Sequence, residues 1–180
     1  PQIIKKLVEV AAERINVFVE KLCKAGVDAF WIVGGEYVTV QLGPKAFDEL
    51  LKPYDVELTG IIHKYGGIAH YHNHGPVTRF LEDFLDLEID VLSPLEAPPC
   101  GDLDLAVAKE KIGDEICLMG NVDDMMVLGF ATEEEAKDIA RKCIEAAGTN
   151  GFILGGTDSG TYNEKAARNF IAMVDVAKEF

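Results

Sequence analysis

The stretch HYHNHGPV, from His70 to Val77, places three of the four histidines of this chain at alternate positions. In a β-strand, side chains two residues apart share one face, so His70, His72 and His74 would point the same way. Neutral imidazole is a good zinc ligand, and a catalytic zinc has three protein ligands and one open position. The spacing therefore predicts a metal site that is held by His72 and His74.

Carboxylates that follow other predicted strands are candidates for the third ligand and for catalysis: Glu36, Glu96 and Asp123. A second interpretation gives the histidines hydrogen-bonding roles, in the structure or in substrate binding, because no cysteine and no second ligand pair lies nearby in the sequence. The sequence leaves both interpretations open.

A loop of small residues over 155–163, GGTDSGTYN, precedes the last predicted helix. Backbone amides in such a loop can bind an anion ahead of a helix, which makes Gly155, Gly156 and Thr157 candidate cofactor-binding residues. A tight turn explains the same composition equally well.

Helices and strands alternate along the whole chain. Helical periodicity predicts helices over about 3–22, 44–65, 77–87, 104–112, from Thr132 onward, and over 163–177. Short apolar runs predict strands over 28–33, 66–74, 89–94, 116–121 and 151–156. Thr132 with Glu135 three residues later is a capping-box signature, and Asp104 is expected to cap the helix that follows it.

This alternation favours parallel β/α units, because parallel strands need crossover helices and are buried on both faces. A doubly wound open sheet and part of an eight-stranded barrel both fit the pattern. No GxGxxG or GxxxxGK[ST] motif follows any predicted strand, so the usual nucleotide-binding signature of the open sheet is absent. We expect one α/β domain over residues 1–180.

The composition limits the classes of partner. Seventeen Lys and Arg against thirty-one Asp and Glu give a net charge of −14, which repels nucleic acids and anionic membrane surfaces. Four widely spaced cysteines form no CxxC pair, and no apolar stretch is long enough to span a bilayer. We expect a cytoplasmic protein with a small-molecule substrate, and, since the sequence begins at Pro1 in helical periodicity, a fragment or a processed chain.

Several stretches, in their order, resemble the C-terminal portion of the uroporphyrinogen decarboxylase superfamily. They are GVDAFWIVGGEY, LGPKAFDELLKPYD, HNHG, PLEAPPCGDLDLAVAKEKIGDEICLMGNVD and GFILGGTDSG. The resemblance covers essentially all 180 residues, and residues 101–123 are its most specific part. It implies an eight-stranded β/α barrel, of which this chain would supply about the last five strands. Five strands cannot close that barrel, so the resemblance also implies either a missing N-terminal half or self-association.

The superfamily contains porphyrinogen decarboxylases and cobalamin-dependent methyltransferases. The methyltransferases hold zinc at a His-x-Cys-Gly motif, which residues 72–75 resemble with His74 in place of the cysteine. The later zinc-binding cysteine of those enzymes would fall near Gly156 or Thr157, where this chain has none. The resemblance therefore implies a zinc site of two histidines and a carboxylate, with a corrinoid as substrate or a corrinoid protein as partner.

The resemblance to the decarboxylases implies a substrate with many carboxylates, which calls for arginines. The chain contains only Arg14, Arg79, Arg141 and Arg168, all in or beside predicted helices. The family's catalytic aspartate and its main substrate-binding arginines belong to the N-terminal portion. We therefore expect metal-assisted methyl transfer from a corrinoid or a methylated substrate to a thiol. Porphyrinogen decarboxylation and a non-catalytic half-barrel that assembles with a partner are the alternatives.

Overall fold

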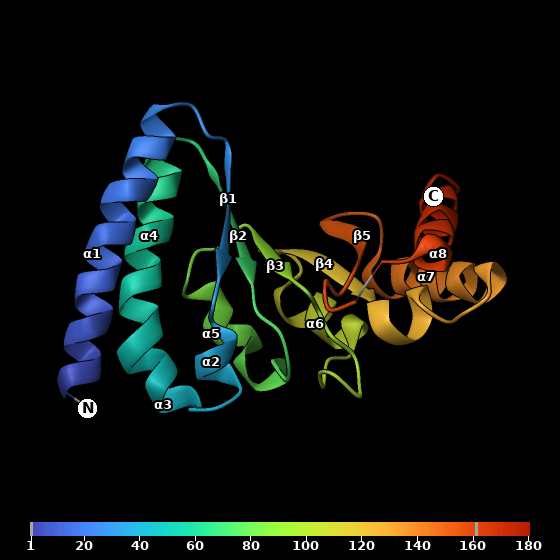
Figure 1. The fold of residues 1–180 in the computed structure, drawn as a ribbon, viewed down its shortest axis with the longest axis horizontal. Coiled ribbons are helices and arrows are strands. Elements are labelled where there is room, and N and C mark those ends of the chain that lie inside the picture. The colour runs from blue at the N-terminus through green and yellow to red at the C-terminus, as the bar shows by residue number, and fades with distance from the viewer. Residues whose placement is uncertain (1, 161) are drawn as a thin grey trace.

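Five parallel strands form one sheet in which the order in space follows the order in the chain (Figure 1). A computed structural model of the protein describes residues 2–160 and 162–180. The strands are β1 (Ala29–Val33), β2 (Ile68–His72), β3 (Val91–Ser93), β4 (Cys117–Val122) and β5 (Phe152–Gly156). The predicted α/β fold is confirmed, and the sheet is consistent with part of a TIM barrel.

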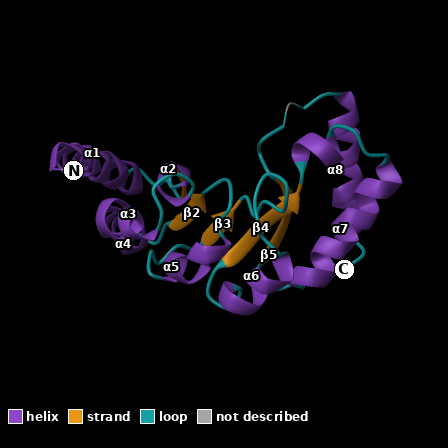
Figure 2. Ribbon diagram, turned by 90° about the horizontal axis from the view of Figure 1, so that it is seen from below, coloured by secondary structure: helices purple, strands orange, loops and turns teal. Residues whose placement is uncertain are grey.

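Helices connect the strands. They are α1 (Gln2–Lys24), α2 (Glu36–Thr39), α3 (Pro44–Ala46), α4 (Lys52–Lys64), α5 (Leu81–Leu85), α6 (Leu105–Ile112), α7 (Glu133–Ala147) and α8 (Glu164–Ala177). Helices α4, α5, α6 and α7 lie along one side of the sheet (Figure 2). Helices α1 and α8 lie at opposite ends of the molecule (Figure 1). Among the described residues, no helix is long and apolar enough to cross a membrane.

The two faces of the sheet differ in burial. Side chains that face the helices, such as Tyr71, Leu92 and Leu118, are fully buried in the main hydrophobic core. Their neighbours along the strands point to the opposite, concave face. There Trp31 is 57% exposed and Val33 is 56% exposed. The concave face is therefore open, although both faces of a parallel sheet are usually covered.

The helix predicted over 44–65 is divided into three parts. Helix α3 ends at Ala46, a π-helical turn spans Phe47–Leu51, and α4 begins at Lys52. Pro53 explains the new start, because proline lacks a backbone N–H and is tolerated only in the first turn of a helix. The helical segment predicted over 44–65 is therefore present from Pro44 to Lys64, with a π-helical turn that the pattern did not predict.

The strand that carries the histidines is shorter than predicted. It ends at His72, so His74 lies in the loop that follows rather than on the strand. The short helix α2 and a π-helical turn over Asp124–Leu128 were not predicted. Both follow strands and occur in stretches too short to display a helical period.

Candidate functional site

The carboxyl ends of β2 and β3 bring the histidines to a serine. His70 and His72 lie on the concave side of β2, and His72 is in register with Ser93 at the end of β3. The side-chain oxygen of Ser93 lies 2.6 Å from His70 Nε2 and 3.2 Å from His72 Nδ1. Parallel strands present their carboxyl ends at one edge of the sheet, which is why residues 23 and 21 positions apart in sequence meet here.

A chain of hydrogen bonds continues from His72 to the loop after β3. His72 Nε2 lies 2.9 Å from His74 Nε2, and His74 Nδ1 lies 3.1 Å from Glu96 Oε1. The two imidazole rings are nearly perpendicular, at 86°, with centroids 4.5 Å apart. Thus the Nε2 atoms of the two histidines face each other, while Ser93 and Glu96 form hydrogen bonds with their Nδ1 atoms.

The hydrogen-bond partners assign the histidine tautomers. An ionised Glu96 only accepts, so His74 carries its proton on Nδ1 and accepts at Nε2. His72 must then donate from Nε2 and accept at Nδ1 from the Ser93 hydroxyl. Ser93 in turn accepts from His70 Nε2. One carboxylate therefore determines the proton position on all three imidazoles.

Glu96 is 3% exposed, and both of its oxygens are engaged. Oε1 also accepts a hydrogen bond from the Ser159 hydroxyl at 3.0 Å, and Oε2 accepts one from the backbone N–H of Gly75 at 2.6 Å. These donors compensate the cost of burying a carboxylate. Glu96 is therefore placed to orient His74 and to fix the loop after β2, rather than to present a free oxygen to the cavity.

Burial, together with the charge that the neighbouring His74 can carry, lowers the pKa of His72 to about 4. His72 is 3% exposed, and its ring makes a T-shaped contact with the ring of Trp31, with centroids 4.6 Å apart. Burial also lowers the pKa of His70. His72 and His70 are thus neutral near pH 7, which is the form of imidazole that binds metals.

Glu36 is the first residue of α2, directly after β1. Among the described residues, its buried Oε2 atom has no hydrogen-bond partner. The charge of Glu36 acts on His72, where it favours the protonated ring. The preceding Gly35 has no room for a side chain, which would collide with Asn73 and Tyr71. Glu36 lines the same cavity as His74 and has one unsatisfied acceptor.

The predicted anion-binding loop contacts a carboxylate of the protein itself. Asp124 is 3% exposed and accepts hydrogen bonds from the Thr157 backbone N–H at 2.8 Å and from the Tyr162 hydroxyl at 2.6 Å. Gly156 lies against the same carboxylate, and a side chain there would collide with it. Gly155 lies on the concave face beside β4, in register with position 121. The amide of Thr157 is therefore already engaged.

Two further polar residues lie at the carboxyl end of β4. Asp123 caps the π-helical turn by accepting a hydrogen bond from the Met126 backbone N–H at 2.7 Å. Asn121 donates through its side-chain amide to the backbone oxygen of Leu95, just before Glu96. The structure thus gives Asp123 a local capping contact and places Asn121 where it supports the loop that carries Glu96.

A cavity of about 630 Å³ opens at this edge of the sheet. Its lining consists of Glu36, Tyr37, Val40, Gln41, His74, Gly75, Glu96, Cys100, Met125 and Ser159. No lysine or arginine is among these described residues, and two of them are carboxylates. Burial raises the pKa of the Cys100 thiol, which disfavours the reactive thiolate.

The two histidines suit a metal ion in spacing and in chemistry. Two nitrogens that bind one zinc at about 2.0–2.1 Å each lie no more than about 4.2 Å apart. The 2.9 Å between the Nε2 atoms of His72 and His74 satisfies this limit. Within residues 2–160 and 162–180, no three His, Cys, Asp or Glu side chains are already grouped as a metal site. A third protein ligand would therefore have to move toward the two imidazoles.

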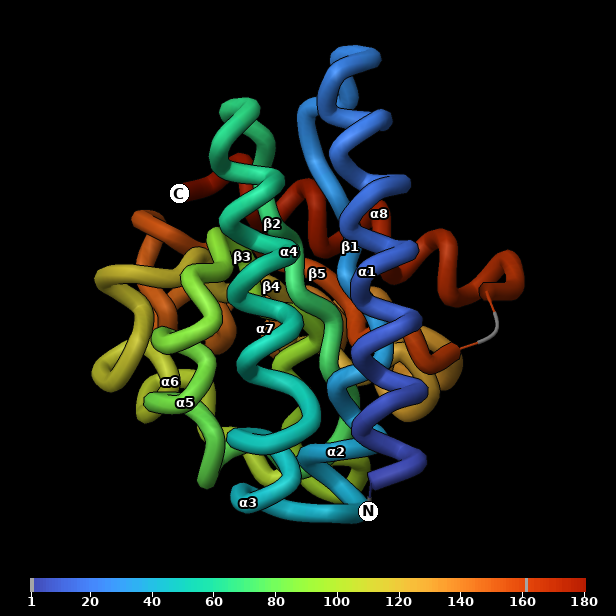
Figure 3. The backbone as a smooth tube through the Cα atoms, turned by 90° about the vertical axis from the view of Figure 1, so that its left-hand side faces the viewer, coloured from blue at the N-terminus to red at the C-terminus, as the bar shows by residue number. Residues whose placement is uncertain are grey.

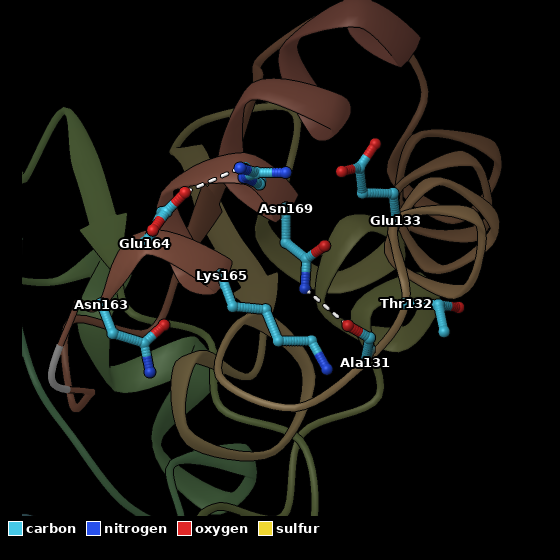
Figure 4. Close-up of a pocket in the computed structure, with 8 residues that line it drawn as sticks. Ala131, Thr132, Glu133, Asn163, Glu164, Lys165 and Asn169 are labelled. Atoms are coloured by element: carbon cyan, nitrogen blue, oxygen red, sulfur yellow. Dashed lines mark hydrogen bonds and ion pairs between the residues drawn. The ribbon is translucent and has the colours of Figure 1, made fainter.

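A separate groove of about 510 Å³ lies between the starts of α7 and α8 (Figure 4). Several of its polar groups are used internally: the Asn169 amide nitrogen donates to the backbone oxygen of Ala131 at 2.9 Å, and Arg168 pairs with Glu164 at 2.7 Å. Asn169 Oδ1 is buried without a hydrogen-bond partner in the described part of the chain. Lys165 donates to the backbone oxygen of Phe130 at its rim. The contacts of Asn169 and Lys165 join α8 to the segment before α7, and none of the histidines lines this groove.

Sequence reasoning did not identify Ser93, Ser159, Asp124 or Trp31 as parts of the site. Ser93 and Trp31 belong to strands whose register with β2 brings them to His72. A single sequence does not contain that register. The only available signal was the position of Ser93 at the carboxyl end of a predicted strand.

The family model described as uroporphyrinogen decarboxylase (URO-D) matches residues 1–180. No curated protein matches. A methyltransferase from Methanosarcina mazei has a similar structure, with a TM-score of 0.77 and 22% sequence identity. The match covers 96% of this chain and 48% of that one, so the chain spans about half the length of that methyltransferase. By the match along its whole length, the chain belongs to the uroporphyrinogen decarboxylase family.

Proposed function

We propose that this chain provides the metal-binding part of the active site of a methyltransferase, with zinc held by His72 and His74. The observation that carries the proposal is the arrangement of the two imidazoles, whose Nε2 atoms meet at 2.9 Å while Ser93 and Glu96 hold the Nδ1 atoms. Histidines that bind metals commonly donate a hydrogen bond from the N–H of their other ring nitrogen to a carboxylate, which fixes the orientation of the ring and its tautomer.

Glu36 is the third ligand in this proposal. Its Oε2 atom is buried without a partner in the described part of the chain, and its charge already acts on His72. Glu96 is less suitable because Ser159, His74 and Gly75 occupy its oxygens. Of the three carboxylates expected to take part, we therefore assign ligation to Glu36 and orientation to Glu96.

Ser93 lets both histidines offer a lone pair to one ion. Without metal, His72 carries its proton on Nε2 and accepts from Ser93 at Nδ1. When His72 moves this proton to Nδ1, the ring donates to Ser93, and the hydroxyl donates instead to His70 Nε2. His70 then carries its proton on Nδ1. This tautomer shift creates no charge, because His72, Ser93 and His70 each remain neutral.

A bound zinc would act as a Lewis acid that lowers the pKa of a thiol, which can then attack a methyl group. The thiol would lose its proton to solvent, and its sulfur would form the new bond to the methyl group. The bond between the methyl group and its donor, a corrinoid cobalt or another methylated substrate, would break with its electron pair left on the donor. The residues of the chain would orient the reactants in the cavity of about 630 Å³, whose apolar wall includes Val40 and Met125.

The charge of this cavity supports methyl transfer over porphyrinogen decarboxylation. A substrate with many carboxylates needs cationic partners. The described lining contains Glu36 and Glu96 but no lysine or arginine. A neutral thiol and a methyl donor meet less repulsion there than a polyanionic macrocycle does.

The test is a thiol methylation assay. The protein is incubated with methylcobalamin and a simple alkyl thiol, and both the loss of the cobalt–methyl absorbance and the thioether product are measured. The expected result is a rate that falls at least about 100-fold in His74→Ala and is unchanged in His63→Ala, which removes an exposed histidine paired with Asp90. Release of carbon dioxide from uroporphyrinogen without thioether formation would overturn the proposal.

A second candidate role is that of a half-barrel that assembles with a partner. The open concave face favours it, because Trp31, Val33 and Ile68 are all about half exposed there, at 57%, 56% and 47%. The partner would be a second copy of the chain or the remaining β/α units of a barrel. The two roles are compatible, since assembly would enclose the histidines.

A further inference from the structure

A second cavity lies on the helical side of the sheet, away from the histidines. It has a volume of about 240 Å³ and is bounded by α1, the end of β1 and the start of α4. Helices α1 and α4 run side by side over β1 and β2 (Figure 3). The wall is mostly apolar, with Val8, Ala11, Ile15, Ile32 and Leu58 among the side chains that form it.

Two polar groups with unused hydrogen-bonding capacity line this apolar wall. Asn16 is only 8% exposed, yet its side-chain amide makes no hydrogen bond within the described part of the chain. Asn16 therefore offers a side-chain amide that is free to bind a molecule in this cavity.

The second group is Asp55 in α4. Its Oδ2 atom accepts a hydrogen bond from the Tyr71 hydroxyl at 2.6 Å, while Oδ1 has no hydrogen bond to any other described residue. Asp55 is the only formally charged residue in the lining, so no protein cation balances it there. Burial raises the pKa of Asp55 to about 6, which reflects the cost of an unpaired carboxylate.

We propose that this cavity is a binding site for a small primary ammonium compound with a short apolar chain. The ammonium group would donate to Asp55 Oδ1 and to the side-chain oxygen of Asn16, and the chain would pack against Val8 and Ile15. Three N–H donors on one head group match two acceptors that the protein leaves free. Nothing in the proposed methyl transfer requires this site.

The charge distribution selects the class of ligand. A carboxylate ligand would meet the charge of Asp55 without any cation to offset it, and a neutral alcohol would offer a single donor. An ammonium ion supplies both the opposite charge and the additional donors, and charge-assisted hydrogen bonds are about twice as strong as neutral ones.

The site also contacts the segment that leads to the histidines. Tyr71, which holds Asp55, lies between His70 and His72 on β2, and Gly34 and Gly35 in the lining precede Glu36. A ligand here would thus touch residues adjacent to both parts of the candidate metal site.

The test uses n-butylammonium, 1-butanol and butanoate as probes. Each is titrated into the protein, and binding is followed by calorimetry and by the NMR signal of the Asn16 side-chain amide. We expect n-butylammonium to bind at least about tenfold more tightly than 1-butanol, to shift the Asn16 signal, and to lose this preference in Asp55→Asn. Butanoate should not bind.

Glu57→Gln is the matched control, because Glu57 is an exposed carboxylate on the same helix. It should bind n-butylammonium as the unmodified protein does. Equal affinity for the amine and the alcohol, ammonium binding that survives in Asp55→Asn, or no binding of n-butylammonium at millimolar concentration would each overturn the proposal. Circular dichroism of every variant establishes that a loss of binding is not a loss of folding.

Discussion

Glu96 controls the geometry of the histidines although it does not face the cavity with a free oxygen. Its contacts with His74, Gly75 and Ser159 are made from a position that is only 3% exposed. Through His74 it also determines which nitrogen of His72 and of His70 carries the proton. A substitution of Glu96 should therefore weaken metal binding by His72 and His74, although Glu96 itself is not a ligand in the proposed site.

Glu96→Gln tests this role. The side-chain amide of the glutamine has only one acceptor atom, since its nitrogen only donates. It therefore cannot accept the hydrogen bonds of both His74 and Gly75. We expect zinc affinity to fall about 10–100-fold, measured by competition with a chromophoric chelator. Glu110→Gln, an exposed carboxylate on α6, should leave the affinity unchanged. Unaltered zinc binding in Glu96→Gln would show that the carboxylate does not orient the site.

Asp55 should make stability depend on pH. Its pKa is raised by burial from 3.8 to about 6, so the folded state binds this proton more tightly than the unfolded chain does. Stability should therefore fall as the pH rises from about 4 to about 6. Above that range Asp55→Asn should be the more stable protein by about 1–3 kcal/mol, and near pH 4 the difference should vanish.

Urea denaturation of both proteins at several pH values measures this difference. Asn can still accept a hydrogen bond from Tyr71, so the contact at 2.6 Å need not be lost. A variant that is less stable than the unmodified protein at pH 7 would contradict the account of Asp55 as an unpaired buried charge.

Among the helices and strands, the sequence predicted correctly those features that depend on residues close together in the chain, such as helix caps. Thr132 and Glu135 form the predicted capping box at the start of α7, and Asp104 caps α6 through the backbone N–H groups of residues 106 and 107. The helical segment over 44–65 was predicted, but the π-helical turn over Phe47–Leu51 within it was not. Periodicity over a window does not reveal one irregular turn.

The capping box gives a prediction for α7. Thr132→Ala removes the side-chain acceptor for the Glu135 backbone N–H and should lower the free energy of unfolding by about 0.5–2 kcal/mol. Thr149→Ala, at an exposed position after the same helix, is the control and should change stability little. The measurement is urea denaturation with the same probe for both variants. Equal effects of the two changes would argue against a specific contribution of the cap.

The site required information that no local pattern contains. The alternate spacing of the histidines indicated a cluster, and His72 and His74 do meet at 2.9 Å. His74 reaches His72 from the loop after β2, however, and Glu96 reaches it from the loop after β3. These contacts depend on the register between strands and on loop conformation, which a single sequence does not specify.

At the scale of the whole molecule, the open sheet is the main feature. Trp31 and Ile153 lie on the concave face of the two edge strands and are 57% and 44% exposed. Sheet edges and apolar faces left open promote association. Sedimentation velocity should therefore show concentration-dependent association of this chain on its own, accompanied by binding of a hydrophobic dye. A monodisperse monomer that binds no dye would contradict this expectation.

The most direct test of the metal site is the zinc content of the protein, purified without a histidine tag and analysed by mass spectrometry after exposure to zinc and removal of the excess. The account predicts about one zinc per chain in the unmodified protein and in the control His63→Ala, and loss of that zinc in a His72→Ala, His74→Ala double variant that remains folded. No bound zinc in the folded unmodified protein, or equal zinc in the double variant, would contradict the account.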